Sequence, residues 1–156
     1  MSENSPPLDP MRCGFIALIG APNAGKSTLL NALVGTKIAI VTPKVQTTRT
    51  RMLGVAMEGQ SQLIYIDTPG IFAPKRRLDR AMVQTAWQGS TDADLTLWLV
   101  DAKRGMADEV KRIAEARTEQ ERRVTLILTK TDLIKPDKLL PLSAALNDMA
   151  PVEETY

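Results

Sequence analysis

The sequence has 156 residues, a length that favours one domain with a core of its own. Hydrophobic residues make up 44% and charged residues 24%, a balance that excludes a disordered or fibrous chain. The 20 basic and 18 acidic residues leave a net charge of +2, a balance that by itself says nothing about nucleic acid. Cys13 is the only cysteine and histidine is absent, which excludes an internal disulfide and a Cys/His metal cluster.

Residues 1–12 are expected to form a flexible leader, because Pro6, Pro7 and Pro10 oppose regular structure. The segment lacks the basic start and apolar centre of a secretory signal. Apolar runs stay well short of the ~18 residues that span a bilayer. We therefore expect a soluble cytoplasmic protein with one domain over residues 13–156.

An apolar run over residues 15–19 enters a glycine-containing stretch, and a helical pattern over residues 27–34 leaves it. The stretch reads Gly20-Ala21-Pro22-Asn23-Ala24-Gly25-Lys26-Ser27. This order of strand, loop and helix is the context of a Walker A phosphate loop. Lys26 would reach the β- and γ-phosphates, and the Ser27 hydroxyl would ligate Mg²⁺. The alternative is a glycine turn of the kind found in any α/β domain.

Loop and strand patterns come next. The first helix should end at Gly35, and residues 36–51, rich in Thr, Lys and Arg, are typical of a long functional loop. Residues 52–57 and 62–66 are strand candidates joined by a short turn, which predicts an antiparallel hairpin.

The remaining residues alternate between helix and strand. Helices are expected from about residues 78 to 88, 108 to 120 and 139 to 149, and buried strands over residues 95–100 and 124–128. This alternation predicts an α/β fold with a mostly parallel sheet, one antiparallel strand and helices on both faces. Ligands bind such sheets at the carboxyl ends of the strands, where three polar motifs of this chain fall.

The second polar motif is Asp67-Thr68-Pro69-Gly70, directly after a strand. Asp67 has the Walker B position, from which a carboxylate holds Mg²⁺; a turn or helix-cap aspartate is the alternative. The Gly70 N–H would face a γ-phosphate, which would make the basic segment after it a switch ordered by the triphosphate. A solvated surface is the alternative for its cations, Lys75, Arg76, Arg77 and Arg80.

The third motif, Thr129-Lys130-Thr131-Asp132, would read the base if the ligand is GTP. Asp132 would accept hydrogen bonds from N1–H and the exocyclic amine of guanine, a pair that adenine lacks. The stem of Lys130 would lie along the base. In the long loop, Thr47 or Thr48 offers a hydroxyl to Mg²⁺, and chemistry alone does not choose between them.

Together these residues resemble the Era GTPases of bacteria. The resemblance covers about residues 13–156. It rests on three motifs: the phosphate loop continued by Thr28-Leu29-Leu30-Asn31, the stretch Gln46-Thr47-Thr48-Arg49, and Asp67-Thr68-Pro69-Gly70. Residues 37–44 are also similar to the first switch of that family. Many translation-related GTPases share the phosphate loop and the Asp-Thr-Pro-Gly motif. The Gln-Thr-Thr-Arg stretch is the more Era-specific part.

The resemblance implies a Ras-like P-loop fold that binds GTP or GDP with Mg²⁺ and hydrolyses GTP slowly. It implies that Lys26, Thr48 and Gly70 carry the catalytic roles, and that Ser27, Thr48 and Asp67 hold Mg²⁺, with Thr48 favoured over Thr47. Asn23 matches a position that helps hold K⁺ in related GTPases. The nucleotide contacts that it implies are Gly20, Ala21, Pro22, Asn23, Ala24, Gly25, Lys26, Ser27, Thr28, Asp67, Thr68, Pro69, Gly70, Thr129, Lys130 and Asp132.

In that family a KH domain follows the GTPase domain and binds small-subunit ribosomal RNA, and the protein assists assembly of the small ribosomal subunit. The resemblance therefore implies ribosomal RNA and the small subunit as partners of a monomeric protein that associates peripherally with membranes. Because the sequence ends at Tyr156, we expect the final strand, a Ser-Ala motif that cradles the base, and the KH domain to be missing.

Two residues depart from familiar patterns. Thr129 stands where the family has Asn, so we expect its hydroxyl to tie the motif to the phosphate loop and guanine affinity to be weaker. Ile71 occupies the position of the water-positioning glutamine of Ras-type enzymes, a hydrophobic substitution that Era-like proteins share. Hydrolysis would then depend on the switch backbone, Mg²⁺ and Lys26.

Three alternatives remain. A tRNA-modification or tandem-domain GTPase fits the shared motifs, but the Gln-Thr-Thr-Arg stretch argues against the tandem-domain type and the short chain against both. A P-loop kinase or ATPase would leave residues 129–132 without a role. A module that lacks its last strand would fold incompletely and bind nucleotide poorly.

Overall fold

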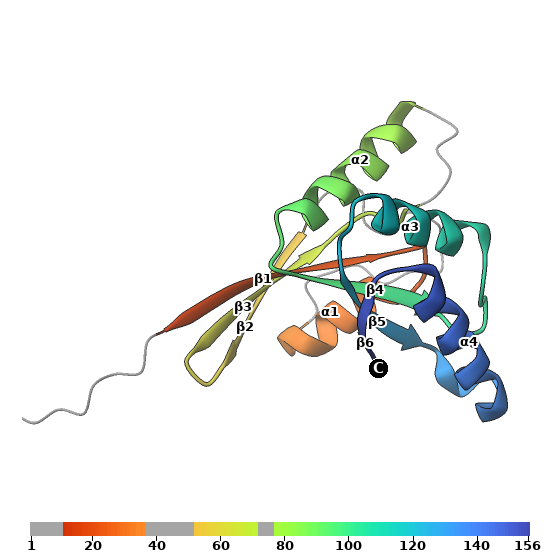
Figure 1. Cartoon of the computed structure of the whole chain (residues 1–156). Helices are drawn as coiled ribbons and strands as arrows, with labels where there is room; N and C mark the ends of the chain where they lie inside the picture. Colours follow the sequence, from red (N-terminus) through yellow and green to blue (C-terminus); the bar gives the residue numbers. More distant parts are fainter. Residues whose placement is uncertain (1–10, 37–51, 72–76) are drawn as a thin grey trace, which may run out of the picture.

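The computed structural model describes residues 11–36, 52–71 and 77–156 (Figure 1). Most of the predicted leader and of the long loop after the first helix lies outside these ranges. The elements in chain order are β1 (Arg12–Gly20), α1 (Lys26–Val34), β2 (Met52–Glu58), β3 (Ser61–Asp67), α2 (Arg77–Thr91), β4 (Leu95–Asp101), α3 (Asp108–Glu119), β5 (Val124–Thr129), the 3₁₀ helix η1 (Thr131–Leu133), α4 (Pro136–Met149) and β6 (Val152–Thr155).

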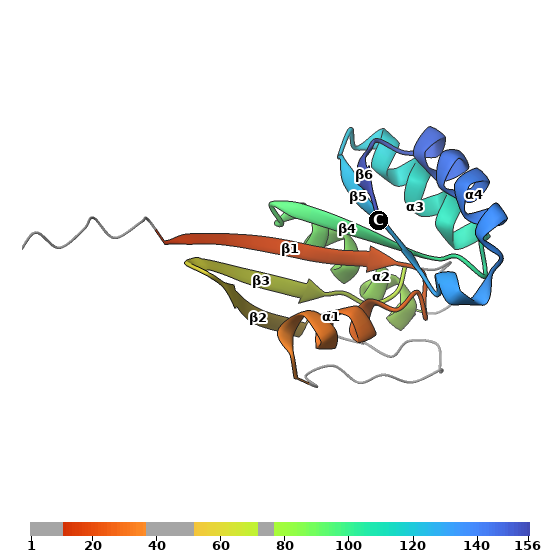
Figure 2. The same cartoon turned by 90° about the horizontal axis from the view of Figure 1, so that it is seen from below.

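The described strands form one sheet in the order β2-β3-β1-β4-β5-β6. β2 is antiparallel to β3 and every other neighbouring pair is parallel, which confirms the predicted sheet. The hairpin turn is Gly59-Gln60, and Gly59 has a φ of 56°, a left-handed conformation that glycine adopts without strain. β1 lies between β3 and β4 in the middle of the sheet, as Figure 2 shows.

The prediction that the final strand is missing is wrong. Residues 152–155 form β6, which runs parallel to β5 at the edge of the sheet. After β6, the Tyr156 N–H donates to the Leu126 carbonyl at 2.9 Å, and the Leu128 N–H donates to the Tyr156 carbonyl at 2.8 Å. The prediction rested on the end of the sequence at Tyr156, and residues 152–155 carry little strand signal of their own because Val152 is the only large apolar residue among them.

Apolar layers cover both faces of the sheet. Successive residues of a strand point to opposite faces, so Leu18 and Ile19 of β1 belong to different layers. Leu18 packs in a cluster with Leu30 of α1, whereas Ile19 packs in a cluster with Ile113 of α3 and Leu146 of α4. Figure 1 shows α2 and α3 above the sheet and α1 below it. Helices on both faces were predicted, and this is confirmed.

The helix ends differ modestly from the predicted ends. α2 continues to Thr91, and α4 begins at Pro136, because proline suits the first turn of a helix, where its missing N–H is not needed. Gly35 ends α1 with a φ of 76° and donates its N–H to the Asn31 carbonyl at 3.0 Å, as expected of a helix cap. Within the described ranges, the helices are too short or too polar to cross a membrane.

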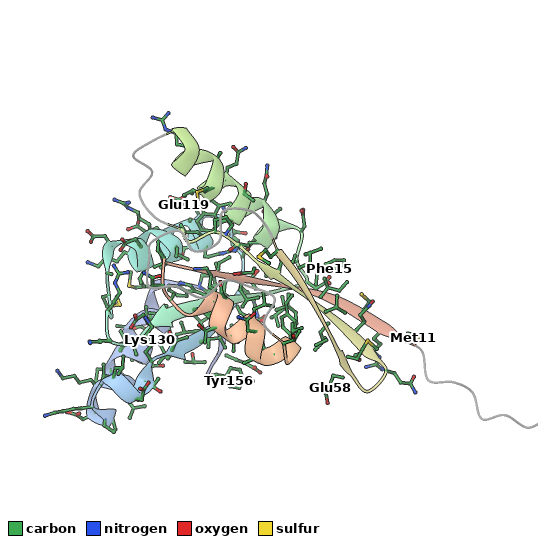
Figure 3. The ribbon with its side chains drawn as sticks, turned by 180° about the vertical axis from the view of Figure 1, so that it is seen from behind. Met11, Phe15, Glu58, Glu119, Lys130 and Tyr156 are labelled. Atoms are coloured by element: carbon green, nitrogen blue, oxygen red, sulfur yellow. The ribbon has the colours of Figure 1, made fainter. Side chains whose placement is uncertain are left out.

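The parallel strands bring their carboxyl ends to one edge of the sheet. Leu18 lies opposite Asp67, Gly20 opposite Leu99, and Asp101 opposite Thr129. Figure 3 shows Lys130, just after β5, far from Met11, Phe15 and Glu58 at the other end. The loops that follow β1, β3, β4 and β5 are therefore neighbours, although they are far apart in the sequence.

Candidate functional site

The loop between β1 and α1 has a backbone that its sequence permits. Asn23 and Gly25 have left-handed φ angles of 62° and 93°, and asparagine and glycine tolerate that region better than other residues. A Cβ on Gly20 would lie 2.5 Å from the Leu99 carbonyl oxygen, so only glycine fits where the loop leaves the sheet. The loop ends at the N-terminus of α1, where N–H groups of the first turn lack helical partners.

Side chains hold the backbone carbonyls of this loop, residue by residue. The Lys26 ammonium donates to the Gly20 and Ala21 oxygens at 3.2 and 2.9 Å. The next three carbonyls accept from side chains of other loops: Pro22 from Arg104 Nη1 at 3.4 Å, Asn23 from Lys130 Nζ at 2.8 Å, and Ala24 from Thr129 Oγ1 at 2.8 Å. The C=O and N–H of a trans peptide point in opposite directions. The carbonyls of Pro22 and Ala24, held from outside the loop, therefore leave the N–H groups of Asn23 and Gly25 directed inward, as an anion-binding loop requires, whereas the Ala24 N–H donates to the Ala21 carbonyl at 3.2 Å.

The positively charged Lys26 side chain lies in a largely desolvated environment. Its side chain is buried, and desolvation lowers the pKa of its ammonium to about 8, although the nearby Asp67 carboxylate acts in the opposite direction. Two carbonyls compensate a buried ammonium only partly. A phosphate group would supply the missing negative charge, so this lysine fits the predicted role.

Ser27 and Asp67 form an oxygen pair beside Lys26. The Ser27 hydroxyl donates to Asp67 Oδ2 at 2.8 Å, and both side chains are buried. Hydroxyl and carboxylate oxygens are ligands that Mg²⁺ accepts, and the ion commonly takes its other ligands from phosphates and water. The described part of the chain contains no cluster of three or more Cys, Asp or Glu side chains, so a metal cage made of protein alone is not present there. The pair fits a phosphate-linked magnesium.

The Asp-Thr-Pro-Gly turn is pressed against the phosphate loop. A Cβ on Gly70 would lie 2.8 Å from Pro22 Cα, and the Ile71 N–H donates to the Gly20 carbonyl at 2.9 Å. The Thr68 hydroxyl donates to the Leu18 carbonyl at 2.6 Å, so that side chain supports β1 rather than facing the loop. Ile71 is 3% exposed and packs in the core with Trp98. Its side chain is therefore part of the core and carries no polar group that could orient a water molecule.

The base-reading motif touches the phosphate loop through its first two residues. The expected tie between Thr129 and the loop is confirmed by its bond to the Ala24 carbonyl. Lys130 has a left-handed φ of 55°, which turns the chain into η1, and Asp132 lies in that short helix with its side chain exposed. Thr28, on α1, is also exposed. The structure thus joins the motif to the loop and leaves Asp132 accessible to a ligand.

Some predicted residues lie outside the described ranges, and two neighbours of the site were not predicted. Thr47 and Thr48 belong to the first group, as do Lys75 and Arg76. Asp101 and Arg104, after β4, belong to the second, because Asp101 binds Lys130 and Arg104 binds Pro22. The sequence signal for Asp101 was an acid directly after an apolar strand, the same signal that drew attention to Asp67.

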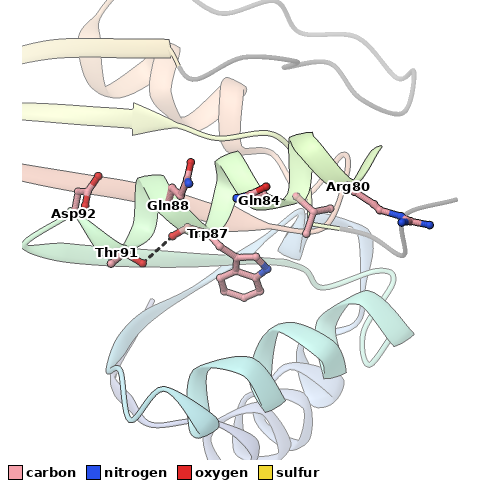
Figure 4. Close-up of a pocket in the computed structure, with 7 residues that line it drawn as sticks. Arg80, Gln84, Trp87, Gln88, Thr91 and Asp92 are labelled. Atoms are coloured by element: carbon pink, nitrogen blue, oxygen red, sulfur yellow. Dashed lines mark hydrogen bonds between the residues drawn. The ribbon is translucent and has the colours of Figure 1, made fainter. Parts of the chain in front are cut away.

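An open groove of about 720 Å³ runs along α2, with the Trp87 side chain on the side that faces α3 (Figure 4). Its lining is Arg80, Val83, Gln84, Trp87, Gln88, Thr91 and Asp92. All of these belong to α2 or directly follow it, and none belongs to the three polar motifs. The groove is therefore separate from the phosphate loop.

A loop that presents N–H groups and a buried lysine, beside a serine–carboxylate pair at the end of a neighbouring strand, defines a P-loop domain for nucleoside triphosphates. The sequence model for the 50S ribosome-binding GTPases matches residues 15–130, and the chain belongs to that family. The predicted similarity to the Era GTPases is also confirmed by comparison with curated proteins.

GTPase Era from Bradyrhizobium sp. (strain BTAi1 / ATCC BAA-1182) is 56% identical over 93% of this chain and 47% of its own length. GTPase Era from Dinoroseobacter shibae is 52% identical over 100% of this chain and 51% of its own length. Among solved structures, Era in complex with MgGDPNP and nucleotides 1506–1542 of 16S ribosomal RNA superposes with a TM-score of 0.84 at 38% identity, over 94% of this chain and 50% of that one. The chain thus spans about half the length of the relatives that it matches.

Proposed function

We propose that this chain is a guanine-nucleotide switch domain that binds GTP or GDP with Mg²⁺ and hydrolyses GTP slowly. The observation that carries the proposal is the bond from Thr129 to the Ala24 carbonyl, which joins the base-reading motif to the phosphate loop. A phosphate loop alone is compatible with ATP. That the motif ending in Asp132 is anchored to the loop supports the proposal that Asp132 reads the base of a nucleotide bound by the loop.

Each half of the site has a distinct task in this proposal. Lys26 and the inward N–H groups bind the β- and γ-phosphates. Ser27 and Asp67 hold Mg²⁺, together with Thr48 when GTP is bound. Bound Mg²⁺ neutralises charge on the phosphate oxygens. Asp132 accepts the two guanine hydrogen bonds, so adenine would leave it unpaired in the complex.

Slow hydrolysis follows from the side chain after the Asp-Thr-Pro-Gly turn. Because Ile71 is packed in the core, it offers no polar group to orient water. The Gly70 N–H would then contact the γ-phosphate, and the switch backbone would orient the attacking water. We expect turnover well below the usual enzyme range of about 1–10³ s⁻¹ unless a partner supplies a missing group.

The cellular role that we propose is assembly of the small ribosomal subunit. The Era structure solved with a 16S ribosomal RNA segment supports this role, and so does the identity above 50% to curated Era proteins. The protein would act in the cytoplasm as a monomer. These 156 residues should bind RNA weakly, because their charges nearly balance.

Nucleotide titration tests the guanine assignment. Fluorescent GDP, GTP and ATP are titrated with Mg²⁺ against the chain, and we expect tight binding of both guanine nucleotides and at least about 100-fold weaker binding of ATP. Asp132→Asn should lose the guanine preference and gain affinity for xanthine nucleotides, because an amide N–H can donate to the oxygen that replaces the guanine amine. Asp137→Asn, an exposed acid in the first turn of α4, is the matched control. Equal affinity for GTP and ATP would contradict the proposal.

A potassium site at Asn23 is a separate part of the proposal. Asn23 lies in the phosphate loop with a left-handed backbone, and its side-chain oxygen is the group that would contact a monovalent cation. GTP turnover should be faster in KCl than in NaCl at equal ionic strength, and Asn23→Ala should remove the difference. Equal wild-type rates in the two salts would eliminate the potassium site without affecting the guanine assignment.

A further inference from the structure

Asp101 ends β4 directly opposite Thr129 of β5 and is 7% exposed. Both of its carboxylate oxygens are engaged. Oδ2 accepts a hydrogen bond from Lys130 Nζ at 2.6 Å, and Oδ1 accepts from the N–H groups of Lys103 and Arg104 at 2.9 and 3.2 Å. Such saturation of a nearly buried carboxylate is typical of a group that organises its neighbours.

The two oxygens control different cations. Through Oδ2 the carboxylate holds the Lys130 ammonium, which also donates to the Asn23 carbonyl. Through Oδ1 it closes the turn after β4, which main-chain bonds from Arg104 and Gly105 to the Asp101 carbonyl also support at 3.1 and 3.0 Å. That turn presents Arg104 to the Pro22 carbonyl. One carboxylate thus sets two cations on consecutive carbonyls of the phosphate loop.

The backbone of Lys130 shows why an anchor is needed. Its φ of 55° is unfavourable for a residue with a long side chain, and such a conformation persists only when surrounding contacts hold it. The Lys130 side chain is 36% exposed, so without Asp101 its ammonium could move into solvent. The turn that carries Asp132 would then lose one of its two ties to the phosphate loop.

We infer that Asp101 is a positioning residue that couples the base-reading half of the site to the phosphate half, by holding Lys130 and Arg104 against the phosphate loop. The inference rests on the proposed guanine-nucleotide function. Asp101 contacts neither base nor phosphate in this account. It affects the rate at which a nucleotide bound by both halves of the site dissociates.

The test compares dissociation rates of fluorescent GDP from the wild type and three variants. Asp101→Asn keeps an oxygen for the turn and removes the ion pair, and should speed dissociation about tenfold. Asp101→Ala removes both and should have the larger effect. Asp148→Asn, an exposed acid near the end of α4, removes the same charge elsewhere and should leave the rate unchanged. The KM for GTP should rise in Asp101→Asn by a larger factor than kcat falls.

A double-mutant cycle separates positioning from a general structural effect. In a Lys130→Met background, Asp101→Asn should speed GDP dissociation less than about threefold, because the contact through which it acts is already gone. The remainder would be carried by Arg104, and Arg104→Met alone should speed dissociation a few fold. A purely structural Asp101 would instead lower the melting temperature and speed dissociation equally in both backgrounds, which would overturn the inference.

Three results decide the matter. If Asp101→Asn does not fold, as judged by circular dichroism, Lys130→Met and Arg104→Met provide the test, and unchanged dissociation in both contradicts the inference. If folded Asp101→Asn releases GDP at the wild-type rate, the inference fails and the guanine assignment stands. If the wild type shows no guanine preference, the proposed function fails, and the inference fails with it.

Discussion

The two halves of the candidate site are built differently. The phosphate half is interior: Lys26, Ser27 and Asp67 are 6%, 9% and 0% exposed, and hydrogen bonds hold them in place. The base half is superficial: Asp132 is exposed on a single turn of 3₁₀ helix. Only Thr129 and Lys130, whose side chains reach the phosphate loop, are fixed by contacts with the other half.

The difference shows where binding energy and selectivity originate. Preorganised donors in a dry site bind phosphate strongly, because little reorganisation is needed when the ligand arrives. An exposed carboxylate adds little to the stability of the free protein, and its hydrogen bonds become important only against a bound base. We therefore expect variants in the phosphate half to change both stability and affinity, and variants at Asp132 to change base preference alone.

Removal of the Lys26 charge should have the largest effect. Lys26→Met should weaken GDP and GTP binding at least about 100-fold, because in the proposed function the ammonium would contact the phosphates directly. The free protein should nevertheless become more stable by about 1 kcal/mol, because burial opposes the charge. The Gly20 and Ala21 carbonyls would keep backbone donors, the N–H groups of Ile71 and Ala24. Titration and urea unfolding measure the two quantities. Lower stability of the free variant would show that the lysine charge is well compensated.

The pH dependence of Lys26 gives the next largest effect. The folded protein lowers its pKa to about 8 from an ordinary value of 10.5, so between these pH values the unfolded chain binds the proton and the folded protein does not. Stability of the free protein therefore rises with pH across that window, by at most about 1.4 kcal/mol per pH unit. Phosphate binding requires the charged form, so GDP affinity should be constant below pH 8 and fall up to about tenfold by pH 9.

Lys26→Arg is the control for this profile. The arginine guanidinium stays charged throughout this pH range. Any pH dependence of GDP affinity in Lys26→Arg therefore comes from ionisation of the nucleotide or of other groups. Calorimetry in buffers of different ionisation enthalpy should detect proton uptake on GDP binding above pH 8 in the wild type and not in Lys26→Arg. Identical affinity profiles for the two proteins would exclude Lys26 as the titrating group.

Sequence pattern predicted most of the fold because most elements carry strong local signals. The apolar runs at residues 95–100 and 124–128 became β4 and β5, and the glycine loop fixed the junction of β1 and α1. β6 was missed because Glu153 and Glu154 fill the middle of a four-residue strand that a parallel neighbour stabilises. That stabilisation comes from pairing with β5, which no local pattern records.

Buried polar contacts were the other part that sequence could not predict. α3 looks like a charged surface helix, yet Arg117 is 1% exposed, stacks 5.3 Å from the centre of the Trp87 ring and donates to the Ser90 hydroxyl. Burial lowers its pKa to about 10. Asp101 is a similar case, because its importance depends on β4 lying beside β5. The motifs at the ends of β1, β3 and β5 were easier, since each is a contiguous set of residues.

The link between the two halves of the site gives a smaller effect. Thr129→Val keeps the shape of the side chain and removes the hydroxyl, which leaves the Ala24 carbonyl without this donor. Loss of one such bond costs about 1 kcal/mol, so the protein should melt a few degrees lower. GDP affinity should also fall, by less than about fivefold, because only the part of this loss that differs between the free and the bound protein weakens binding. Thr129→Asn offers an amide donor in place of the hydroxyl and should restore GDP affinity to at least the wild-type value. If Thr129→Val bound GDP as tightly as Thr129→Asn, the bond between residue 129 and the Ala24 carbonyl would have no effect on GDP affinity.

The smallest effect should be that of Asp132 on stability. Asp132→Ala should change the free energy of unfolding by less than about 0.5 kcal/mol, because the side chain is exposed and its turn is held by Thr129 and Lys130. In saturating GDP, however, the wild type should gain more stability than the variant, because ligand stabilisation follows affinity. Thermal unfolding with and without GDP measures both differences. If the free variant were itself strongly destabilised, the base half would be part of the folded core, and the contrast between an interior phosphate half and a superficial base half would be wrong.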